Sequence, residues 1–179
     1  MNWDKYFYEI CLAVAKNSKC HSRQIGTILV RDKSIISTGY NGPAKNIPTC
    51  DTRYRNDYYV RNKLIVYYDN SVSKVNLYPH NLCPRQALGY KSGEGLDICV
   101  AVHAEVNCLL TAAKNGISTK DTIMYLTVCI PCKDCLAKCI NAGISEIVVT
   151  TLSFYDPISK YIVNNSNIKI RDYDGNYYK

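Results

Sequence analysis

Two short motifs, far apart in the chain, supply the ligands of one metal ion. The first is His103-Ala104-Glu105, and the second is a Pro-Cys-x-x-Cys group that begins at Pro131. His103, Cys132 and Cys135 are ligands that zinc favours, and a catalytic zinc keeps three protein ligands and one position for water. Glu105 is not needed as a ligand, so its carboxylate is available to move protons. The fold must therefore bring these two motifs together.

Each motif begins a predicted helix. Both helical runs end at a glycine, Gly116 in the first and Gly143 in the second, as is common at helix C-termini. Thiolates are favoured at helix N-termini, so this context supports a catalytic site over a purely structural or redox Cys-x-x-Cys pair. Apolar residues recur with helical spacing in both runs: Val106, Leu109, Leu110 and Ala113 in the first, and Leu136, Cys139 and Ile140 in the second.

The remaining periodicity predicts an alternation of strands and helices. We expect a helix over 4–17, a hairpin of strands over 25–31 and 34–39, and strands over 122–128, 146–151 and 168–173. Strands that alternate with helices predict a sheet covered by helices, with parallel pairing after the initial hairpin.

Length and composition favour one enzyme domain over residues 1–179, since 47% hydrophobic residues is ordinary for a globular chain. Charged residues interrupt the N-terminal apolar run, and no stretch is long enough to span a membrane, so we expect a cytoplasmic protein. Ten cysteines then indicate metal ligation and buried thiols rather than disulfides. We expect Cys11, Cys108 and Cys139 to be small buried side chains.

Residues 51–82 interrupt the alternation and are rich in tyrosine and in charge. We interpret them as an insertion: a loop with one short element, a lid, a subunit contact or a surface excursion without a catalytic role. Arginines interleaved with aromatic residues also suit single-stranded nucleic acid. The net charge of +7 is compatible with nucleic acid but steers a small anionic substrate equally well.

The cysteines outside the catalytic motif indicate a second, structural zinc. Four thiolates close a tetrahedral site, and His21 and His80 are alternative ligands. The four candidate cysteines are Cys20, Cys50, Cys83 and Cys99.

Three further segments, together with the zinc motifs, resemble the cytidine deaminase superfamily and within it the deoxycytidylate (dCMP) deaminases. They are Gly39-Tyr40-Asn41-Gly42-Pro43, the segment from Cys20 to Gly26, and the stretch from Cys83 to His103. The resemblance implies a three-layer α/β/α sandwich with a mixed five-stranded sheet. It also implies zinc-dependent hydrolysis of dCMP to dUMP and ammonia, and a homo-oligomer, expected from the resemblance to be a hexamer.

The resemblance further implies substrate contacts and regulation. Activation by dCTP and inhibition by dTTP, with Mg²⁺, are expected in this family. Here, however, side chains occupy Ala44-Lys45-Asn46, where regulated relatives carry a glycine, and this predicts a weak effector response. The expected contacts are Asn41 with sugar or ring, Ala104 and Tyr155 with the base, and Arg23 and Arg85 with phosphate.

Two other functions remain open from the sequence. A tRNA, nucleobase or nucleoside deaminase acting on adenosine or cytidine would use the same zinc motif, and the basic insertion favours it. A noncatalytic zinc-binding module is the third possibility, and the intact Glu105 argues against it.

Overall fold

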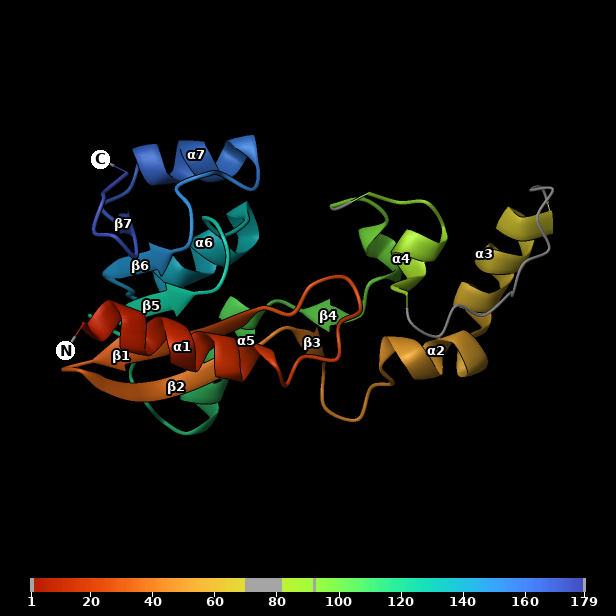
Figure 1. Cartoon of the computed structure of the whole chain (residues 1–179), viewed down its shortest axis with the longest axis horizontal. Coiled ribbons are helices and arrows are strands. Elements are labelled where there is room, and N and C mark those ends of the chain that lie inside the picture. Colours follow the sequence, from red (N-terminus) through yellow and green to blue (C-terminus); the bar gives the residue numbers. More distant parts are fainter. Residues whose placement is uncertain (1, 70–81, 92, 179) are drawn as a thin grey trace. The chain divides into compact units, whose positions relative to one another are not determined.

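The computed structural model describes residues 2–69, 82–91 and 93–178 (Figure 1). These residues form two compact units. The first contains the described residues of Met1–Ser18, Ile25–Asn41 and His103–Lys179, and the second those of Lys19–Gln24 and Gly42–Val102. No helix in the described part of the chain is both long and apolar enough to cross a membrane.

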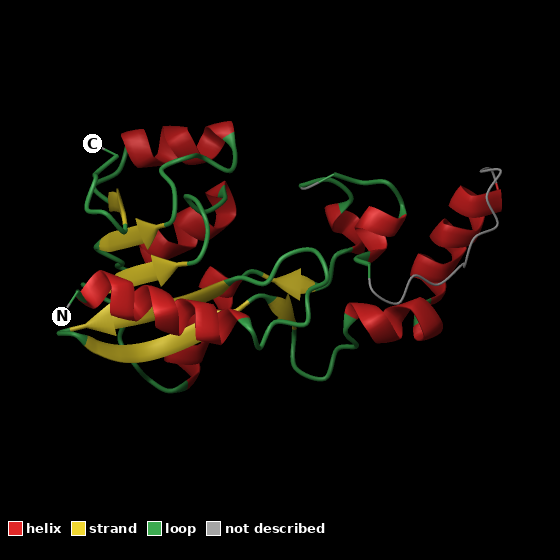
Figure 2. Ribbon diagram, viewed as in Figure 1, coloured by secondary structure: helices red, strands yellow, loops and turns green. Residues whose placement is uncertain are grey.

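The first unit is built on a five-stranded mixed sheet with the order β2-β1-β5-β6-β7 (Figure 2). Strands β1 and β2 form the predicted hairpin, whose turn residues Asp32 and Lys33 both have positive φ, 51° and 60°. The five strands are β1 (Gly26–Arg31), β2 (Ser34–Tyr40), β5 (Ile123–Leu126), β6 (Glu146–Val149) and β7 (Lys169–Asp172).

Besides the hairpin, the sheet contains three pairs of neighbouring strands, and two of these pairs are parallel. β5 pairs with β6, and β6 with β7, in parallel, as predicted. β5 pairs with β1 in the antiparallel sense, which differs from the prediction. In the sheet, β5 lies next to β1 rather than next to β2, and its direction is opposite to that of β1.

Helices cover both faces of this sheet. Residues alternate between the faces along each strand. Ile28, Tyr125 and Val148 face α1, while Leu29 and Met124 belong to the larger cluster on the opposite face. Helices α5, α6 and α7 all contribute to that larger cluster. The expected three-layer α/β/α sandwich is therefore confirmed. The four helices are α1 (Trp3–Ala15), α5 (Ala104–Lys114), α6 (Lys133–Asn141) and α7 (Pro157–Asn164).

Helix α7 was not among the predicted elements. It begins with Asp156, whose side chain accepts a hydrogen bond from the backbone N–H of Ser159, and with Pro157 in the first turn. An aspartate cap followed by proline is a common helix start. The helix lies between β6 and β7 in the chain.

In the second unit, the described part of the tyrosine-rich segment up to residue 69 forms two helices, where a loop with one short element was among the expectations. Asp57 ends α2, and its Oδ1 accepts hydrogen bonds from the N–H groups of Tyr59 and Val60 at the start of α3. Tyr54, Val60 and Leu64 are buried with Ala87. Because the chain breaks between α2 and α3 at Asp57, the helical period cannot be recognised in the sequence. The elements are β3 (Gly42–Pro43), α2 (Cys50–Asn56), α3 (Tyr58–Asp69), α4 (Pro84–Ala87), a 3₁₀ turn η1 (Leu96–Ile98) and β4 (Ala101–Val102).

Candidate zinc centre

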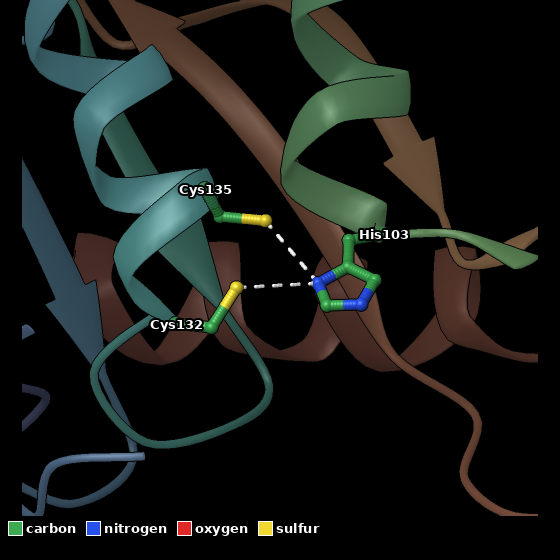
Figure 3. A group of neighbouring side chains, drawn as sticks. All are labelled: His103, Cys132 and Cys135. Atoms are coloured by element: carbon green, nitrogen blue, oxygen red, sulfur yellow. Dashed lines mark hydrogen bonds between the residues drawn. The ribbon is translucent and has the colours of Figure 1, made fainter. Parts of the chain in front are cut away.

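The three predicted zinc ligands meet in the first unit, at the N-termini of two helices. His103 is the N-cap residue of α5, Cys132 is the N-cap residue of α6, and Cys135 lies in the first turn of α6. Both sulfurs face Nδ1 of His103 (Figure 3), at 3.5 Å for Cys132 and 3.2 Å for Cys135. The fold therefore joins the two motifs as the sequence predicts.

The spacing of these atoms fits a tetrahedral zinc ion. Zn–S and Zn–N bonds of ~2.3 and ~2.0 Å at tetrahedral angles place sulfur and nitrogen about 3.5 Å apart. The ligand atoms of His103, Cys132 and Cys135 all lie within 4.8 Å of one another. Among the described residues, no other trio of histidine, cysteine or acidic side chains gathers so closely. One nitrogen and two sulfurs leave the fourth position that a catalytic zinc requires.

Contacts among the three ligand side chains shift the pKa values of the two thiols in opposite directions. The hydrogen bond from Cys135 is the main cause that lowers the pKa of Cys132, to about 4, and the contact with His103 adds to it. The same contact and burial raise the pKa of Cys135. The hydrogen bond with Cys132 raises the pKa of His103. Zinc binds the deprotonated ligands, so loading the centre releases protons.

Glu105 lies beside the ligands without being one of them. Its side chain is 5% exposed, in the first turn of α5. Burial raises the pKa of this carboxyl, and Cys132 adds to the effect, while His103 and a hydrogen bond from Cys135 oppose it. A buried carboxyl in contact with the ligand set can both take up and give back a proton.

Three of the expected substrate contacts belong to the same unit. Ala104 is fully buried, and Tyr155, 39% exposed, precedes α7. Asn41 is buried, and its Oδ1 accepts a hydrogen bond from the N–H of Ile25 at 2.8 Å. At least one polar atom of Asn41 thus holds the backbone beside β1.

The two expected phosphate contacts lie in the second unit. Arg23 is exposed. Arg85 is only 9% exposed, and its Nη2 donates to the carbonyl of Lys91 at 3.3 Å. Within the described part of the chain, the Nε of Arg85 has no hydrogen-bond partner.

The second unit also contains the four cysteines expected to bind a structural zinc. A hydrogen bond from Cys50 is the main cause that lowers the pKa of Cys83, to about 5. The same contact raises the pKa of Cys50, and the nearby Cys20 adds to that increase. Cys99 follows η1, and the alternative ligand His80 lies outside the described residues.

Three other cysteines are core residues. Cys11, Cys108 and Cys139 are each 0% exposed. The prediction that they are small buried side chains is confirmed. Burial raises the pKa of Cys11 and of Cys108 to about 12, which keeps both thiols protonated.

Sequence inspection missed two residues that contact the loop around Cys132. Asp156 accepts a hydrogen bond from the N–H of Lys133 at 2.9 Å, and Ser159 donates to the carbonyl of Pro131 at 2.9 Å. Burial opposes ionisation of Asp156, but the N–H groups of Lys133 and Ser159 outweigh it and lower its pKa. The Asp156-Pro157 helix start was the available signal.

Known proteins match this chain over most of its length. Residues 1–151 match the family described as the cytidine and deoxycytidylate deaminase zinc-binding region. A deoxycytidylate deaminase of Schizosaccharomyces pombe is 29% identical over 96% of this chain and 44% of its own length. The chain thus spans less than half of that relative, and of a Saccharomyces cerevisiae relative as well. A deoxycytidylate deaminase of Mycobacterium phage D29 is 27% identical over 82% of this chain and 93% of its own.

A solved structure supports the fold. The dCMP deaminase of cyanophage S-TIM5, in complex with dCMP and dUMP, has a TM-score of 0.63 and 17% identity, and the match covers 94% of each chain. At this identity the likeness concerns the fold alone. The match over residues 1–151 includes both zinc motifs, and the chain therefore belongs to the cytidine and deoxycytidylate deaminase family.

Proposed function

We propose that this chain hydrolyses dCMP to dUMP and ammonia. The observation that carries the proposal is the trio of His103, Cys132 and Cys135 beside the buried carboxyl of Glu105. The choice of dCMP among aminopyrimidines rests on relatives named deoxycytidylate deaminase in fungi and phages. A structural zinc would not need a carboxyl that stands apart from its ligands.

The chemistry assigned to the chain's own residues is proton transfer. Bound zinc supplies the Lewis acidity that makes water a nucleophile near neutral pH. Glu105 accepts one proton of the attacking water and gives it to N3 of the pyrimidine, as the water oxygen adds to C4. Glu105 then moves the second proton to the amine, the C4–N bond breaks and ammonia leaves. The product keeps its proton on N3 and a carbonyl at C4.

Substrate recognition is a further part of the proposal. Tyr155 packs on the base, and Ala104 holds the pyrimidine edge through its backbone at the start of α5. Asn41 contacts the sugar or ring, while Arg23 and Arg85 are assigned to the phosphate. The unsatisfied Nε of Arg85 supports its assignment, because a buried guanidinium donor calls for an acceptor.

A structural zinc and nucleotide regulation complete the proposal. We assign a second zinc to Cys20, Cys50, Cys83 and Cys99 on the contact of Cys50 with Cys83. Among the described residues, no three of these four sulfurs lie within 4.8 Å of one another, so the site requires the cysteines to draw together around the ion. We also propose that the chain forms a homo-oligomer, a hexamer by family resemblance. Its effectors are dCTP and dTTP, both with Mg²⁺. The response to these effectors is weak because side chains fill the Ala44–Asn46 loop. A cytoplasmic location suits ten free cysteines.

A screen of substrates tests the activity directly. Zinc-loaded full chain is incubated separately with dCMP, CMP, cytidine, dCTP and an adenosine-containing RNA, and ammonia is measured. We expect the highest kcat/KM with dCMP. Faster deamination of the RNA or of cytidine would replace the proposed substrate, and no ammonia from any of them would favour a noncatalytic zinc-binding module.

A further inference from the structure

The loop that carries Cys132 is held on both sides by the start of α7. The N–H of Lys133 donates to Oδ2 of Asp156 at 2.9 Å, and Oγ of Ser159 lies 2.9 Å from the carbonyl oxygen of Pro131. Pro131 and Lys133 are the chain neighbours of Cys132. Both peptide groups that set the direction of this ligand are therefore tied to α7.

The contact with Asp156 also places a carboxylate at the N-terminus of α6. Cys132 is the N-cap residue of α6, and a side chain in that position normally accepts a hydrogen bond from the first turn of the helix. The Cys132 sulfur makes no capping bond of ordinary hydrogen-bond geometry, although the backbone N–H of Cys135 helps to lower the pKa of its thiol. Asp156 instead brings an acceptor and a negative charge to the positive end of α6. The sulfur of Cys132 faces His103 instead.

The two holding residues are themselves fixed. Oδ1 of Asp156 accepts the N–H of Ser159 at 2.8 Å, and the Ser159 hydroxyl lies 2.9 Å from Oδ2 of Asp156. The side chain of Ser159 is 0% exposed. One carboxylate thus caps α7 and contacts the first N–H of α6, so the starts of the two helices are linked.

From these contacts we infer that Asp156 and Ser159 are positioning residues of the zinc centre. They hold the peptide groups on either side of Cys132 so that its sulfur is already directed at the ion. Partners that orient metal ligands typically change metal affinity by about 10–100-fold when they are removed. The role in catalysis rests on the proposed deaminase function, whereas the role in metal binding does not.

Two substitutions separate this role from helix capping. Asp156→Ser keeps a good N-cap for α7, but its shorter side chain does not reach Lys133. Ser159→Ala removes the link to Pro131 and leaves both bonds from backbone N–H groups to Asp156. Asn2→Ala is the matched control, since Asn2 caps α1 by accepting from the N–H of Lys5 at 3.2 Å, in the same unit but without a link to the Cys132 loop.

Zinc affinity is measured for each full-length variant by competition with a chromophoric chelator. Cobalt(II) is then substituted for zinc, and the thiolate-to-cobalt absorption is recorded as a difference from the unaltered chain. Any metal bound by the cysteines of the second unit contributes equally to the spectrum of every variant, so its absorption cancels in the difference spectra. We expect about 10-fold or more weaker zinc binding and altered cobalt bands in Asp156→Ser, a smaller change in Ser159→Ala, and no change in Asn2→Ala.

Unchanged zinc affinity and cobalt bands in a folded Asp156→Ser variant would reduce Asp156 to a helix cap and overturn the inference. If that variant fails to fold, Ser159→Ala decides in the same way by the same two measurements. Failure of the proposed function has a different signature. In that case the unaltered zinc-loaded chain does not deaminate dCMP, although the substitutions still weaken metal binding.

Discussion

At the scale of single residues, Glu105 is the group to which we assign a chemical rather than a structural role. Its carboxyl is buried beside the zinc ligands and occupies no ligand position. Glu105→Gln keeps the size of the side chain and removes its ability to exchange protons. We expect the variant to keep its zinc and its fold while kcat for dCMP falls by about 10²–10⁴-fold.

Zinc content by elemental analysis and far-UV circular dichroism check the first half of that expectation, and ammonia release checks the second. Leu110→Gln is a control on the same helix, since Leu110 is 56% exposed. A Glu105→Gln variant that retains its zinc and most of its rate would remove Glu105 from the mechanism.

At the same scale, the sequence predicted the candidate zinc ligands but not the residues to which we assign their orientation. Ligand types and spacing are local properties, so His103, Cys132 and Cys135 can be identified without a structure. Asp156 acts on Lys133, which is distant in the chain, and only the fold brings the two together. For Asn41, the motif predicted a contact with the substrate but not the structural contact. Its Oδ1 accepts a hydrogen bond from the backbone N–H of Ile25.

At the scale of elements, the packing of α5 against β2 depends on Gly39. A Cβ at this position would lie 2.4 Å from the backbone N of Cys108 and 2.5 Å from the carbonyl oxygen of Ala104. We expect Gly39→Ala to lower the free energy of unfolding by about 1–3 kcal/mol, because the helix must move away from the strand. The exposed neighbour Thr38 provides a control. Urea unfolding in which Gly39→Ala matches Thr38→Ala in stability would contradict this close packing.

A second prediction at this scale concerns the junction of α2 and α3. The Arg53 side chain is 8% exposed, contacts Asp57 at 2.7 Å and donates to the carbonyl of Ile98 at 2.7 Å. Burial opposes ionisation of Asp57, but hydrogen bonds from Arg53, Val60 and Tyr59 outweigh it and hold the pKa of the carboxyl below its ordinary value. Ionised Asp57 therefore stabilises the folded state above its unfolded pKa, and this contribution is lost as pH falls through the lower folded pKa.

Asp57→Asn keeps the shape of the side chain and removes its charge. Near neutral pH we expect the variant to be about 1–3 kcal/mol less stable than the unaltered chain. The difference should shrink as the pH is lowered through the acidic range, in urea titrations at a series of pH values. A difference that stays constant down to the acid limit would assign the effect to packing rather than to charge.

The elements also show where periodicity is informative. The strands and zinc helices are close to their predicted ranges, because their buried residues repeat without interruption. The helices of the insertion were not predicted, because the chain breaks at Asp57 and the buried residues Tyr54 and Val60 fall on different helices. Helix α2 is only seven residues long, so its apolar residues repeat too few times for a helical period to be recognised.

At the scale of the whole molecule, the cysteine distribution predicts two zinc ions per chain. Two thiols belong to the candidate zinc centre, and four others lie in the second unit, where Cys50 contacts Cys83. Elemental analysis of the purified chain should give a ratio near two, and Cys83→Ser should lower it by one. Cys129→Ser is the control, since Cys129 is assigned to neither site. A ratio near one that Cys83→Ser leaves unchanged would remove the structural zinc from the account.

The activity of the whole chain is the central claim, and a zinc titration tests it most directly. Metal-free chain is titrated with zinc while dUMP formation from dCMP is followed, with His103→Ala measured in parallel. We predict that the rate rises in proportion to occupancy of the centre, and that His103→Ala stays inactive throughout. Deamination by the metal-free chain, or none by a fully loaded and folded chain, would contradict a zinc-dependent dCMP deaminase.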